Sequence, residues 1–483
     1  KYEALYKKMA AKIKKIQPAE GLWHSSLLDP VTFATKEASG SGFYCYGLAW
    51  GINHGLLDAE IYLPAVKKAW VGLVDCVHPN GKLGNVQPIG ADPRQVRDDQ
   101  TEIYGVGAFL LAGSEVYKIA MLNGKPKQMF ITTNPAQIFR DNQTISLDMK
   151  HIQKHVKGLT NRNVAIYEFK KNRFRLKQMV EEDGSTEVLF QADFAPGEKK
   201  YFYVTEKPEN AVKAEIQNTA VSNFIPERKD DFAWENDKAG YRMYGPALED
   251  ETITCGIDVF CKSVSYPIME KMLTTKGFNY HADNGEGGDF YKVGNTLGCG
   301  GAAPFIDGKV CLPSKNFSKW KIIANGPIRT IFELTYKPWK AGSVTVSETK
   351  RISLDKGSSL SKIKCYYNIK NDKTLPVAAG IVLRKSEKKF TYADHIIAYW
   401  TSADKNGNIG CGVVYPKQLK AETIQADGHL LMKTNIEKDK RFVYYSGSCW
   451  DKNEEFSTFD KWKEYLIGFK TCVDNPLRIQ FAN

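Results

Sequence analysis

KEASGSGFYCYGLAWGINHGLLD, residues Lys36–Asp58, is the stretch that decides the fold of the first part of the chain. Its apolar run FYCYGLAWGIN predicts a helix over about residues 42–53. Asp58 is a good N-cap for a further helix that continues to about residue 77. The link between the two, HGLLD, is short, as in a helical hairpin.

Two more helices flank this hairpin. Apolar residues recur every three or four positions over Lys1–Ile16, and TEIYGVGAFLLAGSEVYKIA (Thr101–Ala120) is a fourth helical segment. The links before the second helix and after the third are long, whereas HGLLD is short. Such alternation is typical of stacked helical hairpins whose long loops gather on one rim, where binding groups usually lie.

From about Met121 the texture of the sequence changes. Runs such as FITT, VAIYEF, EVLFQADF, KKYFYV, RTIFELTY, SKIKCYYNI and RFVYYSG are separated by turn residues, and many alternate with period two. Only Tyr266–Thr274 and Phe459–Phe469 look helical. The sequence therefore predicts a multidomain α + β protein, with helices over 1–120 and a large antiparallel, β-sandwich-like domain over 121–483.

The chain of 483 residues has a formal net charge of +12, and almost all of the excess lies beyond residue 120. An anionic partner is favoured. Zinc-finger, basic-helix and aromatic RNA-binding signatures are lacking, so we expect no nucleic acid, whereas a uronate or sulfated polysaccharide fits. An ordinary Lys-rich surface explains the charge equally well.

Ten scattered cysteines without a C-x-x-C pair argue against a zinc site and a dense disulfide framework, and several lie in apolar runs typical of buried thiols. No apolar run is long enough to span a membrane. The chain opens on Lys1 rather than Met, which suggests a processed or truncated chain.

GLWHSSLLDP (Gly21–Pro30), the stretch Lys36–Asp58, Ala69–Leu73 and GVGAFLLAGSEV (Gly105–Val116) together resemble the C-terminal part of a known group of enzymes. These are the unsaturated rhamnogalacturonyl and glucuronyl hydrolases, the (α/α)6-barrel glycoside hydrolases of families 105 and 88. The resemblance implies a partial toroid, because the family's ring needs more helices than this segment holds. We expect a missing N-terminal portion or a second chain to complete it.

The resemblance also implies that the catalytic Asp, which protonates the C4=C5 enol ether of an unsaturated uronate, lies earlier in the family sequence than anything here. Only rim groups carry over: Trp23 as an aromatic platform, with His24 and Glu37 as hydrogen-bonding groups for sugar hydroxyls. The alternative is that Trp23 packs on the rim and Glu37 caps the helix that follows it.

The remainder resembles a bacterial family, domain of unknown function 4861, often encoded among polysaccharide-degradation genes. The resemblance rests on PERKDDFAWENDKAGYRMYGPALE (Pro226–Glu249), NYHADNGEGGDFYKVGNTLGCGG (Asn279–Gly301) and NGPIRTIFELTY (Asn325–Tyr336). Together the two resemblances imply a periplasmic or secreted bacterial protein that degrades acidic polysaccharide.

Charge and aromatic residues concentrate in Pro226–Tyr244. Arg forks match carboxylates and aromatic faces stack on sugars, so this stretch suits an acidic sugar. The candidate substrate-binding residues are Trp234, Glu235, Arg242 and Tyr244. A solvated, salt-bridged loop is the alternative.

The glycine-rich stretch Gly277–Gly301 contains His281 and Tyr291. Abstraction of the proton α to a uronate carboxylate needs a base, a carboxylate neutraliser and an acid for the leaving oxygen. If the two motifs converge, the catalytic candidates for these roles are His281, Arg228 and Tyr291. Arg384 and His395 are further substrate-binding candidates, and a structural or merely exposed His281 is the alternative.

The spacing of Asp283, Asn284, Glu286 and Asp289 resembles that of oxygen-rich calcium loops, although the EF-hand pattern is absent. We otherwise expect no metal and no cofactor, and no G-x-S-x-G or H-E-x-x-H motif occurs. Two interpretations of the β-rich part stay open. It acts on uronates by elimination, as a lyase or dehydratase, or it is a non-catalytic carbohydrate-binding or structural module.

Overall fold

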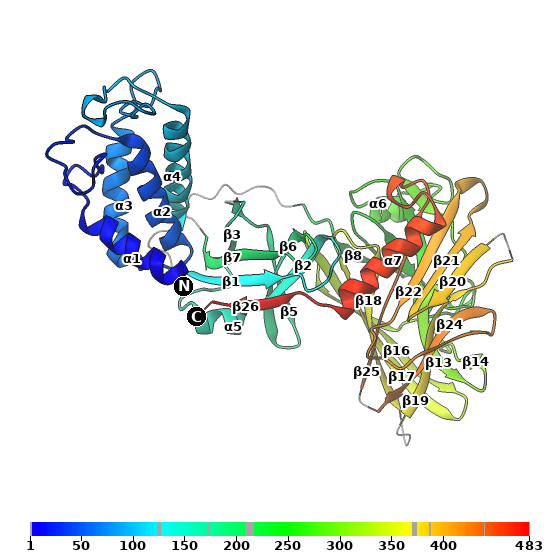
Figure 1. Ribbon diagram of the computed structural model, residues 1–483. Helices are drawn as coiled ribbons and strands as arrows, with labels where there is room; N and C mark the ends of the chain where they lie inside the picture. Colours follow the sequence, from blue (N-terminus) through cyan, green and yellow to red (C-terminus); the bar gives the residue numbers. More distant parts are fainter. Residues whose placement is uncertain are drawn as a thin grey trace. The chain divides into compact units, whose positions relative to one another are not determined.

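The computed structural model describes residues 2–122, 127–171, 173–207, 217–369, 374–385, 388–438 and 440–482. The chain divides into two compact units, Lys1–Lys127 and Gln128–Asn483. The first is helical and the second is built mostly of antiparallel strands, which confirms the predicted α-then-β order (Figure 1). Among the residues just given, no helix is both long and apolar enough to cross a membrane.

The helical unit contains four α-helices in its described part: α1 (Tyr2–Lys15), α2 (Ala38–Asn53), α3 (Ala59–Val74) and α4 (Ile103–Leu122). All four occupy predicted segments, and α2 begins earlier than predicted. Helix α2 packs against both α3 and α4. A Cβ built at Gly42 would lie 3.0 Å from the Cβ of Ala108, so glycine lets α2 and α4 approach closely.

The β-rich unit begins with two small sheets that share one core. The first has the order β26-β1-β7-β3-β4 and the second β2-β6-β5. Their strands are β1 (Lys127–Thr133), β2 (Arg140–Asp148), β3 (Val164–Glu168), β4 (Arg173–Phe174), β5 (Lys177–Glu182), β6 (Ser185–Phe194), β7 (Lys199–Glu206) and β26 (Arg478–Phe481). Phe130, Phe190 and Phe202 pack together between the sheets, beside α5 (Met149–His155).

An eight-stranded sheet, ordered β15-β16-β17-β18-β25-β22-β21-β20, shares the largest core with a five-stranded sheet, β14-β13-β19-β24-β23. The eight strands are β15 (Lys319–Ala324), β16 (Arg329–Ala341), β17 (Val344–Asp355), β18 (Leu360–Ile369), β20 (Lys388–Ala393), β21 (Ile396–Ser402), β22 (Asn408–Val414) and β25 (Arg441–Trp450). The five are β13 (Cys299–Ile306), β14 (Lys309–Val310), β19 (Thr374–Val382), β23 (Glu422–Ala426) and β24 (His429–Glu437).

Helix α7 (Phe459–Asp474) lies across β21 and β22 and buries Trp462 and Leu466 there. It continues five residues beyond the predicted segment. The predicted strand runs are strands, from FITT in β1 to RFVYYSG in β25. The ten cysteines are free thiols, eight of them buried, as the apolar surroundings of several predicted.

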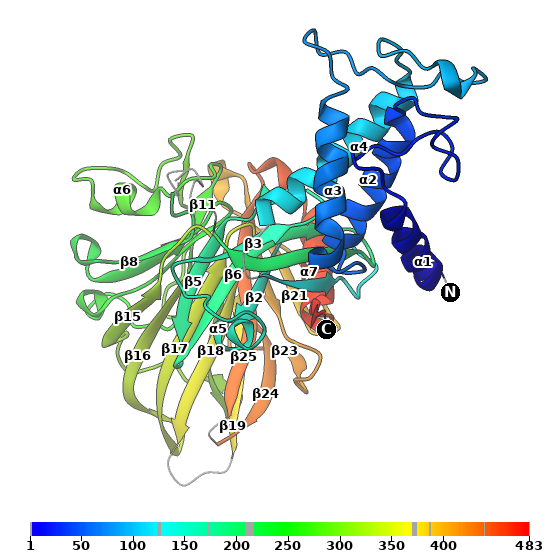
Figure 2. The same cartoon turned by 90° about the vertical axis from the view of Figure 1, so that its left-hand side faces the viewer.

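A further sheet, with five strands, positions the candidate site. Its order is β12-β11-β10-β9-β8, all antiparallel. The strands are β8 (Val221–Ile225), β9 (Asp231–Glu235), β10 (Gly240–Met243), β11 (Asp258–Lys262) and β12 (Gly287–Asp289). One face packs into the largest core, and α6 (Met269–Thr274) covers part of the other (Figure 2).

Candidate functional site

The two motifs of the β-rich part contribute strands to this same sheet. Strands β9 and β10 come from the first motif and β12 from the second, with β11 between β10 and β12. Arg242 on β10 stands opposite Asp258 on β11 and Ala233 on β9. The two motifs therefore meet in one sheet.

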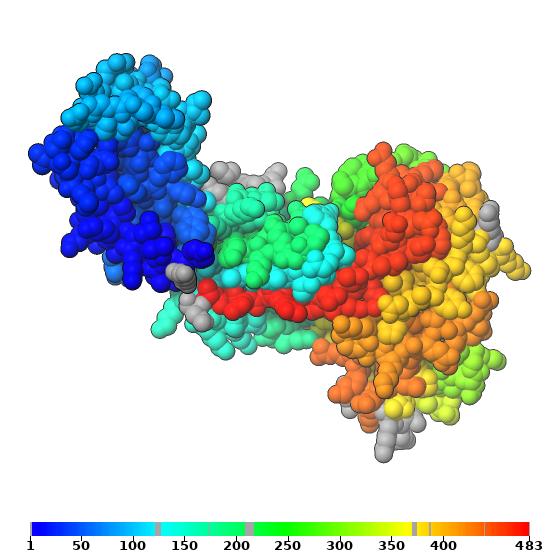
Figure 3. All heavy atoms as spheres, in the orientation of Figure 1, coloured from blue at the N-terminus to red at the C-terminus, as the bar shows by residue number. Residues whose placement is uncertain are grey.

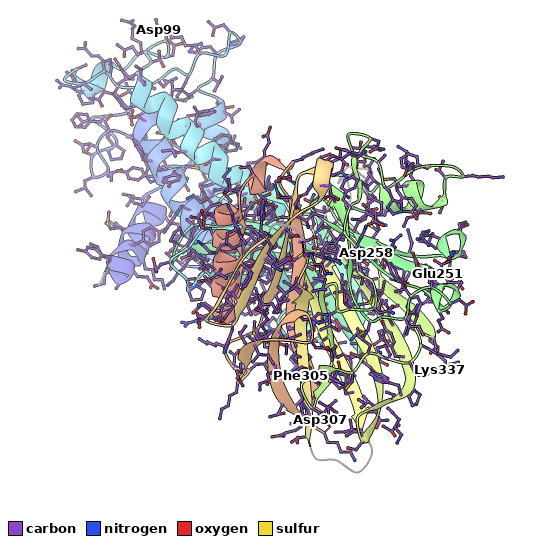
Figure 4. The ribbon with its side chains drawn as sticks, turned by 90° about the vertical axis from the view of Figure 1, so that its right-hand side faces the viewer. Asp99, Glu251, Asp258, Phe305, Asp307 and Lys337 are labelled. Atoms are coloured by element: carbon purple, nitrogen blue, oxygen red, sulfur yellow. The ribbon has the colours of Figure 1, made fainter. Side chains whose placement is uncertain are left out.

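Strand alternation sorts the side chains of this sheet onto two faces. Phe232, Tyr241 and Val259 point into the largest core. Their neighbours Asp231, Arg242 and Asp258 alternate with them and so lie on the opposite face. That face carries the charged groups of the candidate site, and Figure 4 labels Asp258 among the strands.

Arg242 is 1% exposed and lies among three carboxylates. Its Nη2 donates to Asp258 Oδ2 at 2.6 Å and to Asp289 Oδ2 at 2.8 Å, and its Nε lies 3.5 Å from Asp231 Oδ2. Burial raises the pKa of Asp231 to about 6. Burial also raises the pKa values of Asp258 and Asp289. One buried guanidinium thus holds three buried carboxyl groups whose ionised forms are disfavoured.

A second layer of polar side chains lies over Arg242 and its three carboxyl groups, nearer to solvent. Arg228 Nε donates to Tyr280 Oη at 2.5 Å, and the two rings of Tyr280 and His281 have centroids 4.5 Å apart. The guanidinium of Arg242 lies 5.8 Å from the Tyr280 ring centroid and 5.2 Å from that of Tyr244. Arg228, Tyr244, Tyr280 and His281 therefore form one cluster.

His281 is oriented by Asp289. Its Nδ1 lies 3.2 Å from the carbonyl oxygen of Asp289, which can only accept, so Nδ1 carries a proton. The Asp289 carboxylate lies 3.6 Å from the same nitrogen. With Nδ1 protonated, the neutral ring has its lone pair on Nε2, and the side chain is 61% exposed. The arrangement suits a base that works at the surface.

The other two candidates of the first motif, Trp234 and Glu235, make contacts that stabilise the fold. Trp234 is buried, and its Nε1 donates to Ser361 Oγ at 3.0 Å. Glu235 accepts from Lys262 Nζ at 2.5 Å and from the backbone N–H of Met269 at 2.7 Å. Neither joins the cluster of Arg228 and His281.

The remaining candidates of the β-rich part lie elsewhere. Tyr291 is buried in the largest core, where the guanidinium of Arg384 lies 4.9 Å from its ring centroid. His395 lies in the turn between β20 and β21. Tyr280, which sequence reasoning missed, takes the place beside Arg228 that was expected for Tyr291. Its position directly before His281 was the available signal.

In the helical unit, Trp23 is 1% exposed and its Nε1 donates to the Ile13 carbonyl oxygen at 3.0 Å. Glu37 accepts from the N–H groups of Ser39 and Gly40 at 3.0 and 2.6 Å, which caps α2. These are the packing and capping contacts of the alternative interpretation. His24 is half-buried, with Nε2 2.9 Å from a carboxylate oxygen of Glu20.

The acids of the candidate calcium loop pair with different cations. Asp283 accepts from Lys452 at 2.6 Å, Glu286 from Lys271 at 3.2 Å, and Asp289 from Arg242. Within the described part of the chain, no group of three or more His, Cys, Asp or Glu side chains is arranged to hold a metal ion.

Comparison with known families gives two matches. The family model "Domain of unknown function (DUF4861)" matches residues 132–479, and the model "Glycosyl Hydrolase Family 88" matches residues 1–120. An uncharacterized protein of Formosa agariphila is 30% identical over 77% of this chain and 98% of its own length.

The helical unit has relatives of its own. An unsaturated 3S-rhamnoglycuronyl hydrolase of Formosa agariphila is 55% identical over 24% of this chain and 31% of that protein. One from Alteromonas sp. (strain LOR) is 40% identical over 24% and 28%. A solved glycosyl hydrolase family 88 structure from Bacteroides vulgatus is 42% identical, covers 24% of this chain and 34% of that chain, and has a TM-score of 0.23. The chain thus spans about a third of the length of these hydrolases.

Proposed function

Because the chain belongs to the family of the domain of unknown function 4861 and resembles glycoside hydrolase family 88 over residues 1–120, we propose that it takes part in degrading uronate-containing polysaccharide. The similarity of the helical unit to unsaturated rhamnoglycuronyl hydrolases supports this substrate class. We place the protein in the periplasm or outside the cell, where such polysaccharide is met.

In this proposal the helical unit is the closing part of an (α/α)6 toroid, completed by further helices of the protein or by a second chain. The support is its exposed apolar surface. Val71 on α3 is 61% exposed, and Leu110 and Ile103 on α4 are 64% and 91% exposed. Helices that expose side chains of this size usually pack against a partner.

The β-rich unit, in the same proposal, acts on a uronate by elimination. The observation that carries this is the convergence of Arg228, Tyr280 and His281 above Asp289. Each supplies one requirement of the reaction: a cation for the carboxylate, a proton donor and a base.

In the elimination, His281 Nε2 takes the proton from C5, and the electron pair of the broken C5–H bond forms the C4=C5 double bond. The C4–O bond breaks, and the leaving oxygen takes the hydroxyl proton of Tyr280. Because Tyr280 Oη accepts its hydrogen bond from Arg228, its own proton is available for this transfer.

The products are a new hydroxyl end and an unsaturated uronyl end. An unsaturated uronyl end is what hydrolases resembling the helical unit remove. Elimination in one unit and hydrolysis in the completed toroid would therefore act on the same chain in succession.

Replacement of His281 tests the elimination. Turnover of saturated uronyl oligosaccharide is followed by the rising ultraviolet absorbance of the conjugated double bond. We expect His281→Gln to lower kcat by about 10²–10⁴-fold, the usual contribution of a general base. His155→Gln is the matched control, since His155 is an exposed histidine on α5 of the same unit. An unchanged rate in His281→Gln rules out the base.

A non-catalytic binding module is the second candidate. The 61% exposure of the His281 side chain favours it, because catalytic bases usually lie in deeper pockets. Binding of the oligosaccharide without any absorbance change, weakened by Arg228→Gln, is the result that distinguishes this function from elimination.

A further inference from the structure

A cleft of about 580 Å³ lies in the β-rich unit, apart from the cluster of Arg228 and His281. Strand β2 forms one wall, the ends of β16, β17 and β18 form another, and α7 with the segment after it closes a third. In Figure 3 the C-terminal segment, in red, lies beside the cyan surface that contains β2. The volume falls in the range of small-molecule sites.

The walls of the cleft are held together by specific contacts. Gln178 Nε2 donates to the Arg329 carbonyl oxygen, and Gln191 Nε2 to that of Lys356, both at 2.8 Å. Glu182 accepts from both Arg351 and Lys364 at 2.8 Å. These contacts dock the β2-β6-β5 sheet onto the eight-stranded sheet, so the cleft is a fixed feature of this unit.

Most charged side chains of the cleft have partners. Arg329 Nη2 donates to Asp355 at 2.7 Å, and Glu455 pairs with Lys238. The Arg140 guanidinium donates to Asn134 Oδ1 at 2.7 Å and to a backbone carbonyl.

Two cations of the cleft differ from the rest. Among the residues that the structure describes, neither the Lys356 nor the Lys362 side chain has a hydrogen-bonded or ion-paired partner. Burial lowers the pKa of Lys362, the charges of Lys364 and Arg329 lower it further, and the carboxylates of Asp355 and Glu182 raise it. A half-buried ammonium that has no hydrogen-bonded carboxylate of its own is stabilised by an added anion.

Aromatic rings share the cleft with these lysines. Tyr445 and Phe469 meet edge to face with centroids 5.2 Å apart, and the side chain of Phe139 is exposed at the rim. Ring faces of this kind pack on the apolar faces of sugars. Asn142 and Gln143 add polar groups on the β2 side.

We propose that this cleft is a second carbohydrate site, which binds an anionic sugar with its carboxylate or sulfate group on Lys362 and Lys356. The two lysines select an anion, and the choice of a sugar rests on the proposed function. Such a site would hold one part of the polysaccharide while another part of the same molecule reacts at the candidate active site.

Titration calorimetry on the full chain tests the proposal, with a saturated glucuronate oligosaccharide as the probe. We expect Lys362→Met to weaken binding at one of two sites by about tenfold or more, the loss of one charge-assisted hydrogen bond. Lys463→Met is the control, because Lys463 lies on α7, which borders the cleft, but pairs with Asp460 at the surface outside the cleft. Its affinity should stay within about twofold.

Arg228→Gln separates this site from the candidate active site. Binding that survives Arg228→Gln and is weakened by Lys362→Met supports the cleft even if elimination is never seen. Binding weakened by Arg228→Gln but unchanged in both Lys362→Met and Lys362→Gln overturns the cleft and leaves the proposed function intact. Absence of any binding by the wild-type chain overturns both.

The same titration identifies the anion. If carboxyl reduction of the probe weakens its binding to the wild-type protein as much as Lys362→Met weakens binding of the unreduced probe, the contact is to the carboxylate. A sulfated probe whose binding survives carboxyl reduction and is weakened by Lys362→Met assigns it to the sulfate. A carboxyl-reduced, sulfate-free probe that binds with undiminished affinity overturns the anionic site.

Discussion

The sequence indicated that Arg242 lies in a charged segment, but it did not indicate that Arg242 is buried. Arg242 was expected to contact substrate, yet it is 1% exposed and is held by Asp258 and Asp289. Arg228 and His281, which sequence reasoning also chose, do reach the surface together. Composition indicated where charged and aromatic residues concentrate, but burial decides which of these charges is free to bind a ligand.

Strand parity explains the errors in the first motif. DFAWE forms β9 rather than a solvated loop, so Phe232 and Trp234 share the core face while Asp231 and Glu235 share the other. The alternation was visible in the sequence. The partners Ser361 and Lys262 were not, because they come from distant strands.

Asp231 provides a prediction for pH dependence. Its pKa in the folded protein is raised to about 6 by burial, so the folded state binds more protons than the unfolded state between about pH 4 and pH 6. The free energy of unfolding therefore falls as pH rises through this range. A shift of about two pH units corresponds to about 3 kcal/mol at most. Asp231→Asn should remove the share of the fall that this carboxyl contributes, in denaturant unfolding measured from pH 4 to pH 8, while the raised pKa values of Asp258 and Asp289 maintain the rest.

Asp250→Asn is the control for this experiment, because Asp250 is an exposed carboxylate close by in the sequence. Its stability profile should run parallel to that of the wild type. A parallel profile for Asp231→Asn as well would show that this carboxyl does not titrate differently on folding.

At the scale of elements, α6 is fixed to the sheet by one buried ion pair. Glu235 on β9 accepts from Lys262 on β11 and from the N–H groups of Ile268 and Met269, where α6 begins. The sequence predicted a helix over residues 266–274. The observed start at Met269 follows from Pro267 before it and from the carboxylate that receives its first N–H groups.

Glu235→Gln should destabilise the protein by roughly 3–5 kcal/mol, because it leaves the buried ammonium of Lys262 without its counter-charge. Chemical denaturation measures the loss, and hydrogen exchange should rise first in the amides of α6. The double variant Glu235→Gln/Lys262→Met should recover much of the stability. Glu422→Gln, in the exposed pair with Lys433, is the control and should cost less than about 1 kcal/mol.

The helices of the first unit were predictable because their apolar periodicity is local. The early start of α2 was less so, since ASGSG is a poor helical sequence and is held by Glu37, which caps it. The extension of α7 to Asp474 depends in part on the ion pair of Lys470 and Asp474, whose Nζ and Oδ2 atoms lie 2.5 Å apart.

At the scale of the whole molecule, the chain joins two units with different relatives. The order of a helical and a β-rich part follows from the change of sequence period near residue 121. The number of sheets and their order do not, because strands such as β13 and β19 pair across many residues and no local signal specifies such pairs.

The exposed apolar side chains of α3 and α4 give a prediction at this scale. If further helices cover them, Leu110→Ser should weaken association of the protein with the completing helices while leaving the β-rich unit folded. Native mass spectrometry reports the assembly, and circular dichroism reports the fold. Tyr392→Ser, at a 51% exposed position of β20, is the control and should leave the assembly unchanged. Equal assembly of both variants would contradict a packing role for Leu110.

The ultraviolet absorbance of the conjugated uronate double bond, followed with saturated uronyl oligosaccharide and the full chain, tests the central claim most directly. We expect absorbance to rise with the wild-type protein and the rise to be lost in His281→Gln. Constant absorbance with the wild type, on a substrate that the protein binds, would contradict elimination and leave the β-rich unit a binding module.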